Sequence, residues 1–229
     1  ALAPACASRS APGLPLAKTA PGTDFDTALA KLRATDGVLY AEPNYIMVQQ
    51  VMPNDPQFAQ QWSLHNTGQL GSPADRDINA PEAWDVTTGS SSVVVAVIDS
   101  GIDYNHEDLA ANVYSNPPEC TPDRTDNDGN GYPDDCHGID AVNGDSDPID
   151  DEGHGTMVSG DIGAVGNNGI GVAGVAWNVK LLPCKLTHTT GSGDTADAIT
   201  CLDYVAMMRD RGVNIVASNN SWGNSLPSR

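Results

Sequence analysis

Two short motifs in this sequence carry side chains suited to acid–base chemistry. An apolar run ends in Val97-Ile98-Asp99-Ser100-Gly101, and Gly153-His154-Gly155-Thr156 follows farther along the chain. An Asp at the end of a strand can accept the Nδ1 proton of a His, which fixes the tautomer whose Nε2 acts as a base toward a hydroxyl. Either motif alone could be an ordinary turn, but the pair indicates nucleophilic catalysis with Asp99 as orienting residue and His154 as base.

A competing interpretation assigns Asp99-Ser100-Gly101 to an aspartic peptidase. In those enzymes two such carboxylates share one proton at the active site. The interpretation requires a second motif of the same kind, or a dimer, together with an all-β fold. The alternation of strands and helices described below speaks against it.

A run of alternating oxygen side chains, residues 126–135, is the second candidate for chemistry. Hard cations such as Ca²⁺ need six to eight oxygen ligands supplied by a loop that can turn tightly. The run resembles the first half of an EF-hand loop, but His137 stands where the bidentate Glu would be. A solvated acidic loop is the alternative. The candidate ligands are Asp126, Asp128, Asn130 and the carbonyl of Tyr132, with Asp134 or Asp135 closing the set.

The charge is unevenly distributed along the chain. The formal net charge is −19, and twelve of the 30 acidic residues but only Arg124 among the 11 Lys and Arg lie between Glu119 and Glu152. Such a balance argues against a nucleic-acid partner, because a polyanion would be repelled. A second, weaker cation candidate, equally well explained as a solvated loop, comprises Asp145, Asp147, Asp150 and Asp151.

The five cysteines include no Cys-x-x-Cys pair, which disfavours zinc and thioredoxin-like chemistry. Cys120 and Cys136 bracket the acidic loop, and a disulfide between them, which the sequence leaves open, would indicate an oxidising compartment. Cys184 and Cys201 are either paired or buried; we expect buried, unpaired thiols. Cys6 is the simplest remaining free thiol.

Strands and helices alternate through the second half of the chain. Strands are predicted at Ser92–Asp99, Trp177–Pro183 and Val213–Ser218, and a helix at Thr195–Arg211, which Asp194 or Thr195 caps and Gly212 ends. This order predicts an α/β fold, a mainly parallel sheet with helices on both faces. Ligands of such sheets bind at the carboxyl ends of strands, where Asp99 stands.

The first 50 residues differ in character. Residues 1–23 are rich in Ala, Pro and Ser without periodicity and are predicted to be linker or disordered. A helix is predicted at Asp26–Thr35 and a strand after Gly37, forming a small α/β piece that ends near Gln50. The longest strongly apolar run, Val93–Ile98, is too short to span a bilayer, so no membrane span is expected.

Four sequence blocks resemble, in order, those of the subtilisin-like serine peptidases (subtilases, peptidase S8 family). They are VVVAVIDSGIDYNHEDL, DDEGHGTMVSGDIGAVGNNGIGVAGVAWNVKLLPCK, GSGDTADAI and NIVASNNSWG, within residues 53–224. The resemblance implies that Asp99 and His154 belong to a catalytic triad. It also implies that an extended polypeptide substrate pairs with two backbone segments, Ser221-Trp222-Gly223 and Gly191-Ser192-Gly193.

The resemblance implies Ca²⁺ as well. Subtilases commonly hold this ion between a residue near the mature N-terminus, the Asp of the Asn-His-x-Asp-Leu block and a loop after the helix of the catalytic His. The matching positions in this chain are Asp55, Asp108, Asn168 and the carbonyls of Val165, Ile170 and Val172.

The family pattern is incomplete within these 229 residues. No Gly-Thr-Ser block and no Gly-Asn oxyanion block occurs, so we expect residues 51–229 to be the N-terminal part of a peptidase domain, with a sheet incomplete at the C-terminus and no activity as given. Residues 24–50 resemble the carboxyl half of an inhibitor-type propeptide, which implies the chain's own propeptide as a partner. A secreted monomer is expected. The alternative is a non-catalytic pseudopeptidase or peptide-binding module stabilised by calcium.

Overall fold

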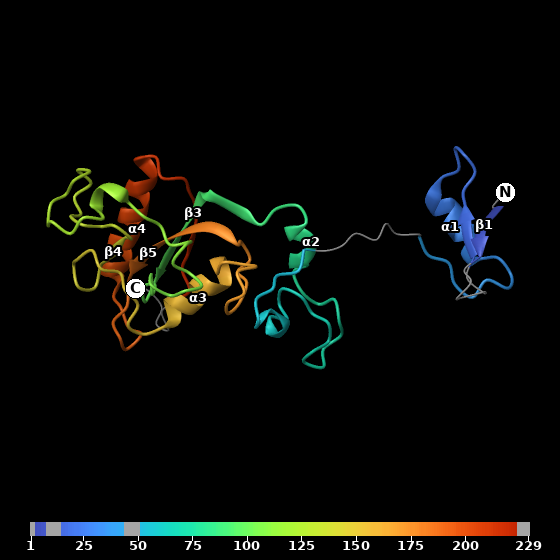
Figure 1. Cartoon of the computed structure of the whole chain (residues 1–229), viewed down its shortest axis with the longest axis horizontal. Coiled ribbons are helices and arrows are strands. Elements are labelled where there is room, and N and C mark those ends of the chain that lie inside the picture. The colour runs from blue at the N-terminus through green and yellow to red at the C-terminus, as the bar shows by residue number, and fades with distance from the viewer. Residues whose placement is uncertain (1–2, 8–14, 44–50, 224–229) are drawn as a thin grey trace, which may run out of the picture. The chain divides into compact units, whose positions relative to one another are not determined.

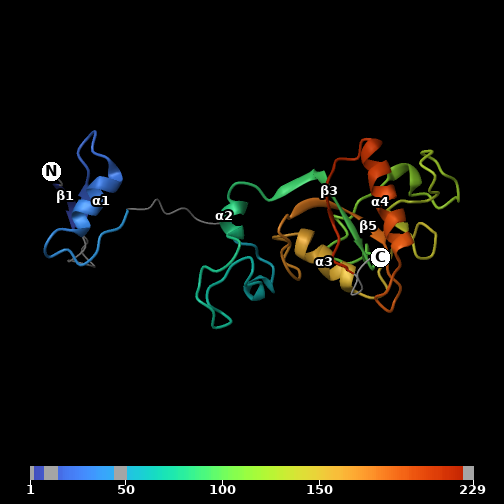
Figure 2. The same cartoon turned by 180° about the vertical axis from the view of Figure 1, so that it is seen from behind.

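The computed structural model describes residues 3–7, 15–43 and 51–223, which belong to two compact units, Ala1–Gln49 and Gln50–Arg229. Figure 1 labels the main elements, and Figure 2 shows them from behind. The elements are β1 (Ala3–Ala7), β2 (Pro15–Lys18), α1 (Phe25–Arg33), the 3-10 helix η1 (Phe58–Gln60), α2 (Ala80–Trp84), β3 (Gly89–Asp99), the 3-10 helix η2 (Pro117–Glu119), β4 (Ile139–Asp140), α3 (His154–Gly163), β5 (Asn178–Lys185), α4 (Thr195–Asp210) and β6 (Ile215–Asn219).

The first unit combines an antiparallel strand pair, β1 and β2, with helix α1. The two strands lie within residues 1–23, so the prediction of a linker there was wrong for these positions. Helix α1 confirms the predicted helix, and it begins after Asp24, whose side chain accepts a hydrogen bond from the backbone N–H of Thr27. Of the predicted strand after Gly37, residues 38–43 form no strand and residues 44–50 lie outside the described residues.

The second unit is built on a parallel sheet in the order β4-β5-β3-β6. The β-branched run at the end of β3 is buried on both faces, as a strand in the middle of a parallel sheet must be. Register pairs Asp99 with Lys185 and Lys185 with Asp140. Three strands therefore end together, each in a charged residue, at the carboxyl edge of the sheet.

Helices cover both faces of this sheet, which confirms the predicted fold class (Figures 1 and 2). On one face, Ile98 and Leu182 pack in one core cluster with Tyr204 of α4. On the other face, Val97 and Leu181 pack in a second cluster, against which the apolar side of α3 rests. Successive residues of a strand point to opposite faces, so a continuous apolar run serves both helices.

A third cluster anchors the segment that precedes β3. Phe58, Trp84 and Trp177 are all buried, and the rings of Trp84 and Trp177 lie 4.7 Å apart between centroids. The indole Nε1 of Trp84 donates a hydrogen bond of 2.9 Å to the carbonyl of Val175. This contact joins α2 to the loop that leads into β5.

Two disulfides cross-link the second unit. One joins Cys120 to Cys136 and settles the question that the sequence left open. The other joins Cys184 at the end of β5 to Cys201 in α4, so the expectation of unpaired thiols there was wrong. Both half-cystines of the second bridge are fully buried, and a buried thiol and a buried half-cystine look alike in sequence. Structural disulfides indicate an oxidising compartment.

None of the helices in the described residues has the length and hydropathy to cross a membrane.

Two glycines of α3 provide a matched test of how this helix packs against the sheet. A Cβ added to Gly163 would lie 2.5 Å from Cγ1 of Val179, whereas a Cβ on Gly160 would meet nothing within 4 Å. We expect Gly163→Ala to lower the free energy of unfolding by about 1–3 kcal/mol through overpacking. Gly160→Ala should raise it by about 0.5–1 kcal/mol, because Ala restricts the unfolded chain. Urea denaturation measures both, and equal effects would contradict the assigned packing of α3.

Candidate functional site

Asp99 and His154 meet at the carboxyl edge of the sheet. Asp99 is the last residue of β3 and His154 the first of α3, and Nδ1 of His154 lies 2.7 Å from Oδ1 of Asp99. The same oxygen accepts the backbone N–H of Ser100 at 2.8 Å. Asp99 is 4 % exposed, whereas the side chain of His154 is 42 % exposed. A buried carboxylate thus holds one nitrogen of a solvent-accessible imidazole and leaves the other free.

Two glycines allow this approach. A Cβ on Gly155 would lie 2.1 Å from the carbonyl oxygen of Gly101 and 3.1 Å from Cβ of Asp99. Gly101 has a φ of +104°, a conformation that other residues rarely adopt. Gly101 and Gly155 are therefore needed for helix α3 to begin directly against the end of β3.

Asp99 also sets the protonation behaviour of His154. Its hydrogen bond, and then its negative charge, raise the pKa of His154 above the ordinary value of 6.5, and the nearby charges of Glu152 and Asp150 act in the same direction. The other carboxylate oxygen of Asp99, Oδ2, is buried and has no hydrogen-bond partner among the described residues. The site therefore favours a positive charge on the imidazole.

The two segments expected to bind substrate are exposed and lie outside the strands of the sheet. Gly191-Ser192-Gly193 turns back on residues 186–188: the N–H of His188 donates to the carbonyl of Ser192, and a Cβ on Gly193 would lie 2.1 Å from the carbonyl of Leu186. Ser221-Trp222-Gly223 follows β6, and Nε1 of Trp222 donates to the carbonyl of Ile98 at 2.9 Å. Their pairing with a peptide stays a prediction.

Residues of the family-type calcium site gather at one place. Asp55 accepts hydrogen bonds from the backbone N–H groups of Asn167 and Asn168, and Asp108 accepts from the side-chain amide of Asn168 and the N–H of Val172. Asp55 and Asp108 are 4 % and 2 % exposed. Two buried carboxylates thus face the loop that also contains Val165 and Ile170.

The acidic loop is organised differently from our prediction. The only His, Cys, Asp or Glu group of three or more with metal-binding geometry in the described residues is Glu119, Asp128 and Asp135, whose oxygens lie within 4.8 Å of one another. Asp126 is not in this group; its carboxylate accepts the backbone N–H groups of Asn130 and Gly131.

Asn130 and Tyr132 make structural contacts, and their role as calcium ligands stays a prediction. The amide of Asn130 donates to Asp135 at 2.8 Å, and its oxygen accepts the N–H of Tyr132, while the ring of Tyr132 packs edge-on against Tyr204 of α4. Asn130 and Tyr132 therefore help to hold the loop against α4.

Glu119 is the residue that sequence reasoning missed. It precedes Cys120, and Asp135 precedes Cys136, so the disulfide between the two cysteines brings both carboxylates together. That adjacency was the available signal. Glu119 is 1 % and Asp135 0 % exposed, and burial raises the pKa of Asp135.

The second acidic run does not converge on one point, so the cation candidate at residues 145–151 was wrong. Asp151 forms an ion pair with the buried Lys185 at 2.9 Å. Asp147 accepts a hydrogen bond from Tyr104, and Asp150 accepts from Ser100 and Thr156. Each of these carboxylates is committed to a separate structural contact.

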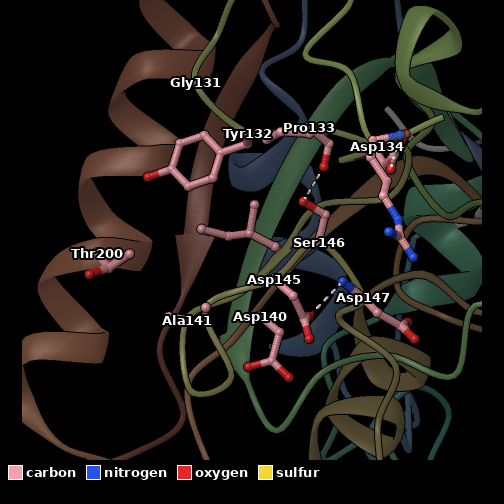
Figure 3. Close-up of a pocket in the computed structure, with 13 residues that line it drawn as sticks. Gly131, Tyr132, Pro133, Asp134, Asp140, Ala141, Asp145, Ser146, Asp147 and Thr200 are labelled. Atoms are coloured by element: carbon pink, nitrogen blue, oxygen red, sulfur yellow. Dashed lines mark hydrogen bonds between the residues drawn. The ribbon is translucent and has the colours of Figure 1, made fainter. Parts of the chain in front are cut away.

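A cavity of about 670 Å³ lies between the acidic loop, residues 139–147 and Thr200 of α4. Figure 3 shows the hydrogen bonds that shape one wall, from Ser146 to the carbonyl of Pro133 and from the N–H of Asp147 to Asp145. The Asp99–His154 pair is not among the lining residues, so the cavity is separate from that pair.

A parallel α/β sheet whose terminal Asp orients a His is the arrangement found in the subtilisin class of serine peptidases. The sequence profile of the subtilase family, Peptidase_S8, matches residues 90–229. The chain therefore belongs to the subtilase family.

Curated relatives support this assignment. The chain is 42 % identical over 139 residues to subtilisin-like protease 1 of Plasmodium berghei, covering 60 % of this chain and 23 % of that protein. It is 32 % identical over 197 residues to halolysin of Haloferax mediterranei, covering 86 % of this chain and 32 % of that protein. The chain thus spans about a quarter to a third of the length of these relatives.

A solved structure, the complex of Aeromonas sobria serine protease with the chaperone ORF2, has a similar fold. It matches with a TM-score of 0.59 and 28 % sequence identity, covering 78 % of this chain and 27 % of that one.

The raised pKa of His154 makes a testable prediction. We expect Asp99→Asn to return the pKa of His154 toward 6.5, as measured by NMR titration. The pKa of His154 is raised in the folded state. The stabilisation that Asp99 gives to protonated His154 is therefore fully present below the pKa of the unfolded state and is lost as the pH rises through the folded pKa. The free energy of unfolding of the wild type should therefore exceed that of Asp99→Asn by more at about pH 5 than at about pH 9. An equal difference at both pH values would contradict the assigned hydrogen bond.

Proposed function

We propose that the protein containing this chain hydrolyses peptide bonds by acyl transfer, with Asp99 and His154 as two members of its catalytic triad. The observation that carries the proposal is the 2.7 Å contact between Oδ1 of Asp99 and Nδ1 of His154. It is supported by membership of the subtilase family and by relatives named as proteases.

The chemistry follows from the tautomer that Asp99 imposes. With its proton on Nδ1, His154 has a lone pair on Nε2 that can remove the proton of a serine hydroxyl as the hydroxyl attacks the scissile carbonyl. The imidazolium formed is stabilised by Asp99 and later protonates the leaving amine. The serine is supplied by sequence outside these 229 residues, since no Gly-Thr-Ser block occurs within them.

The substrate is an extended polypeptide. Gly191-Ser192-Gly193 and Ser221-Trp222-Gly223 are exposed. The N–H of Gly191 and the carbonyl of Ser192 already bond to His188, and the remaining backbone groups of the two segments would pair with a peptide. Main-chain pairing gives affinity with little selectivity, so other residues set the preference for particular side chains. Ser221 has no role as nucleophile; it accepts a hydrogen bond from Asn219.

A phosphonate probe for active-site serines tests the assignment. We expect the probe to label the complete protein but not the 229-residue chain, which lacks the nucleophile block. In the complete protein, His154→Ala should reduce kcat by a factor on the order of 10⁶, because the triad acts as a unit. Labelling of the 229-residue chain would contradict its inactivity, and full activity of His154→Ala would refute the assigned base.

Calcium is the ion these sites fit best, and subtilases commonly bind it. Glu119, Asp128 and Asp135 offer three carboxylates at close range, of which two are buried, while the nearest cation is Arg211, 3.3 Å from Asp128. Burying like charges is costly unless a cation offsets them, and oxygen ligands suit Ca²⁺. Asp55 and Asp108, with Asn168 and the carbonyls of Val165, Ile170 and Val172, would hold a second ion. In both places calcium would stabilise loops around the sheet.

Calorimetry with EDTA and with added Ca²⁺ tests these sites. We expect Ca²⁺ to raise the melting temperature, with a stabilisation of about 2.7 kcal/mol at a concentration 100 times Kd. Glu119→Gln should reduce this gain, while Asp145→Asn, which makes the same change of charge at an exposed position, should retain it. An identical melting temperature with EDTA and with Ca²⁺ in the wild type would overturn the metal assignments.

Residues 24–50 are the carboxyl half of a propeptide in this proposal. Residues 24–50 match the carboxyl half of a subtilase inhibitor-type propeptide in pattern, and residues 51–229 form the N-terminal part of the peptidase domain. The unit boundary between Gln49 and Gln50 supports this division. With two disulfides and a protease fold, the protein is a secreted enzyme.

A further inference from the structure

We propose that Asp150 and Ser100 are positioning residues that fix the start of helix α3, and with it His154, against Asp99. This inference rests on the proposed function, since it concerns how the catalytic base is held. Asp150 lies in the acidic segment, and neither the triad nor a cation site uses its carboxylate. The inference gives this carboxylate a role.

Helix α3 needs outside help at its N-terminus. Its N-cap is Gly153, with φ +109° and no side chain to cap the helix. The first backbone N–H groups of a helix have no partners within it and must be satisfied otherwise. Three side chains from outside the helix do this: Glu152 accepts from the N–H of His154, Ser100 from that of Gly155, and Asp150 from that of Thr156.

Asp150 is the hub of these contacts. Its Oδ1 accepts hydrogen bonds from the hydroxyl of Ser100 at 2.9 Å and from the N–H groups of Glu152 and Gly153 at 3.0 and 2.8 Å. Its Oδ2 accepts from both the N–H and the hydroxyl of Thr156. One carboxylate thus joins the turn before α3, the first turn of α3 and the residue that follows β3.

Ser100 makes this hub relevant to the catalytic pair. Ser100 directly follows Asp99 and Gly155 directly follows His154, and the N–H of Gly155 donates to the hydroxyl of Ser100 at 2.8 Å. This hydrogen bond lies one residue beyond the Asp99–His154 hydrogen bond on each element. Two adjacent contacts between a strand end and a helix start restrict both the distance and the relative rotation, whereas one contact leaves the rotation free.

A further contact extends the arrangement to the loop after β3. The hydroxyl of Thr156, which donates to Asp150, accepts the backbone N–H of Asp103 at 2.9 Å. Burial raises the pKa of Asp150, but its hydrogen bonds from Thr156, Gly153 and Glu152 lower it more, so the group stays ionised. An anion beside the first turn of α3 also opposes the positive end of the helix dipole, which would otherwise disfavour a protonated His154.

The adjacent acid provides a matched control. Asp151 carries the same charge as Asp150, but its carboxylate pairs with Lys185 at 2.9 Å. Among the described hydrogen bonds it makes none to α3 or to Ser100. Asp151→Asn therefore repeats the change in charge without removing the proposed contacts, while Ser100→Ala removes a contact without changing any charge.

The test uses the complete protein that contains this chain and NMR of a ¹⁵N-histidine sample. In the wild type we expect a downfield Nδ1 proton signal from the Asp99–His154 hydrogen bond, assigned by its loss in His154→Gln. Both Asp150→Asn and Ser100→Ala should weaken or abolish this signal and shift the pKa of His154 toward its ordinary value. Asp151→Asn should leave the signal in place. Circular dichroism verifies that each variant is folded. If Asp150→Asn or Ser100→Ala does not fold, the other variant alone is enough for the test.

The outcomes separate this inference from the proposed function. A wild-type chain without the Nδ1 signal would refute the catalytic pair itself. A wild-type signal that persists unchanged in Asp150→Asn and Ser100→Ala would overturn the positioning role while leaving the pair intact. A pKa change in Asp150→Asn alone, with the proton signal retained in both variants, would show that Asp150 acts only through its charge and would also overturn the positioning role.

Discussion

The hydrogen bond between Asp99 and His154 is the constraint on which the described structure around the site depends. It requires a buried carboxylate at the end of a strand and an imidazole at the first position of a helix to meet within 2.7 Å. Gly101 and Gly155 provide the space for this meeting. Parallel packing of β3 between β5 and β6 supplies the rigid end from which Asp99 projects, and α3 lies across that sheet because its apolar side completes a core cluster.

The acidic segment from Glu119 to Glu152 is divided among distinct physical tasks. Glu119, Asp128 and Asp135 gather beside α4 as a cluster of carboxylates. Asp140 and Asp151 surround Lys185, a buried cation at the end of β5, so part of the negative charge neutralises an internal positive charge. Part of the acidic segment therefore has a structural task inside the fold, where Asp140 and Asp151 offset the charge of Lys185.

Much of the fold was predictable because its signals are local. The buried run of β3, the capping Asp194 and terminal Gly212 of α4, and the alternation of strand and helix each depend on neighbouring residues alone. The strands β1 and β2 were missed because Ala- and Pro-rich sequence has little strand propensity, whereas their order depends on pairing with each other. The observed strand boundaries also differ from the predicted ones by a few residues, since the end of a strand depends on its hydrogen-bonded partner.

The sequence by itself determined the family, the Asp99–His154 pair and the parallel α/β class, because these follow from motifs whose residue types and order suffice. Tertiary structure alone decided which carboxylates gather and which cysteines pair. Glu119 joined the acidic cluster in place of Asp126, and Cys184 bonded to Cys201, because both outcomes depend on how a loop or helix folds back in space rather than on residue types alone. The same holds for Asp150, whose neighbours in sequence suggested a cation site but whose neighbours in space are Ser100 and the first turn of α3.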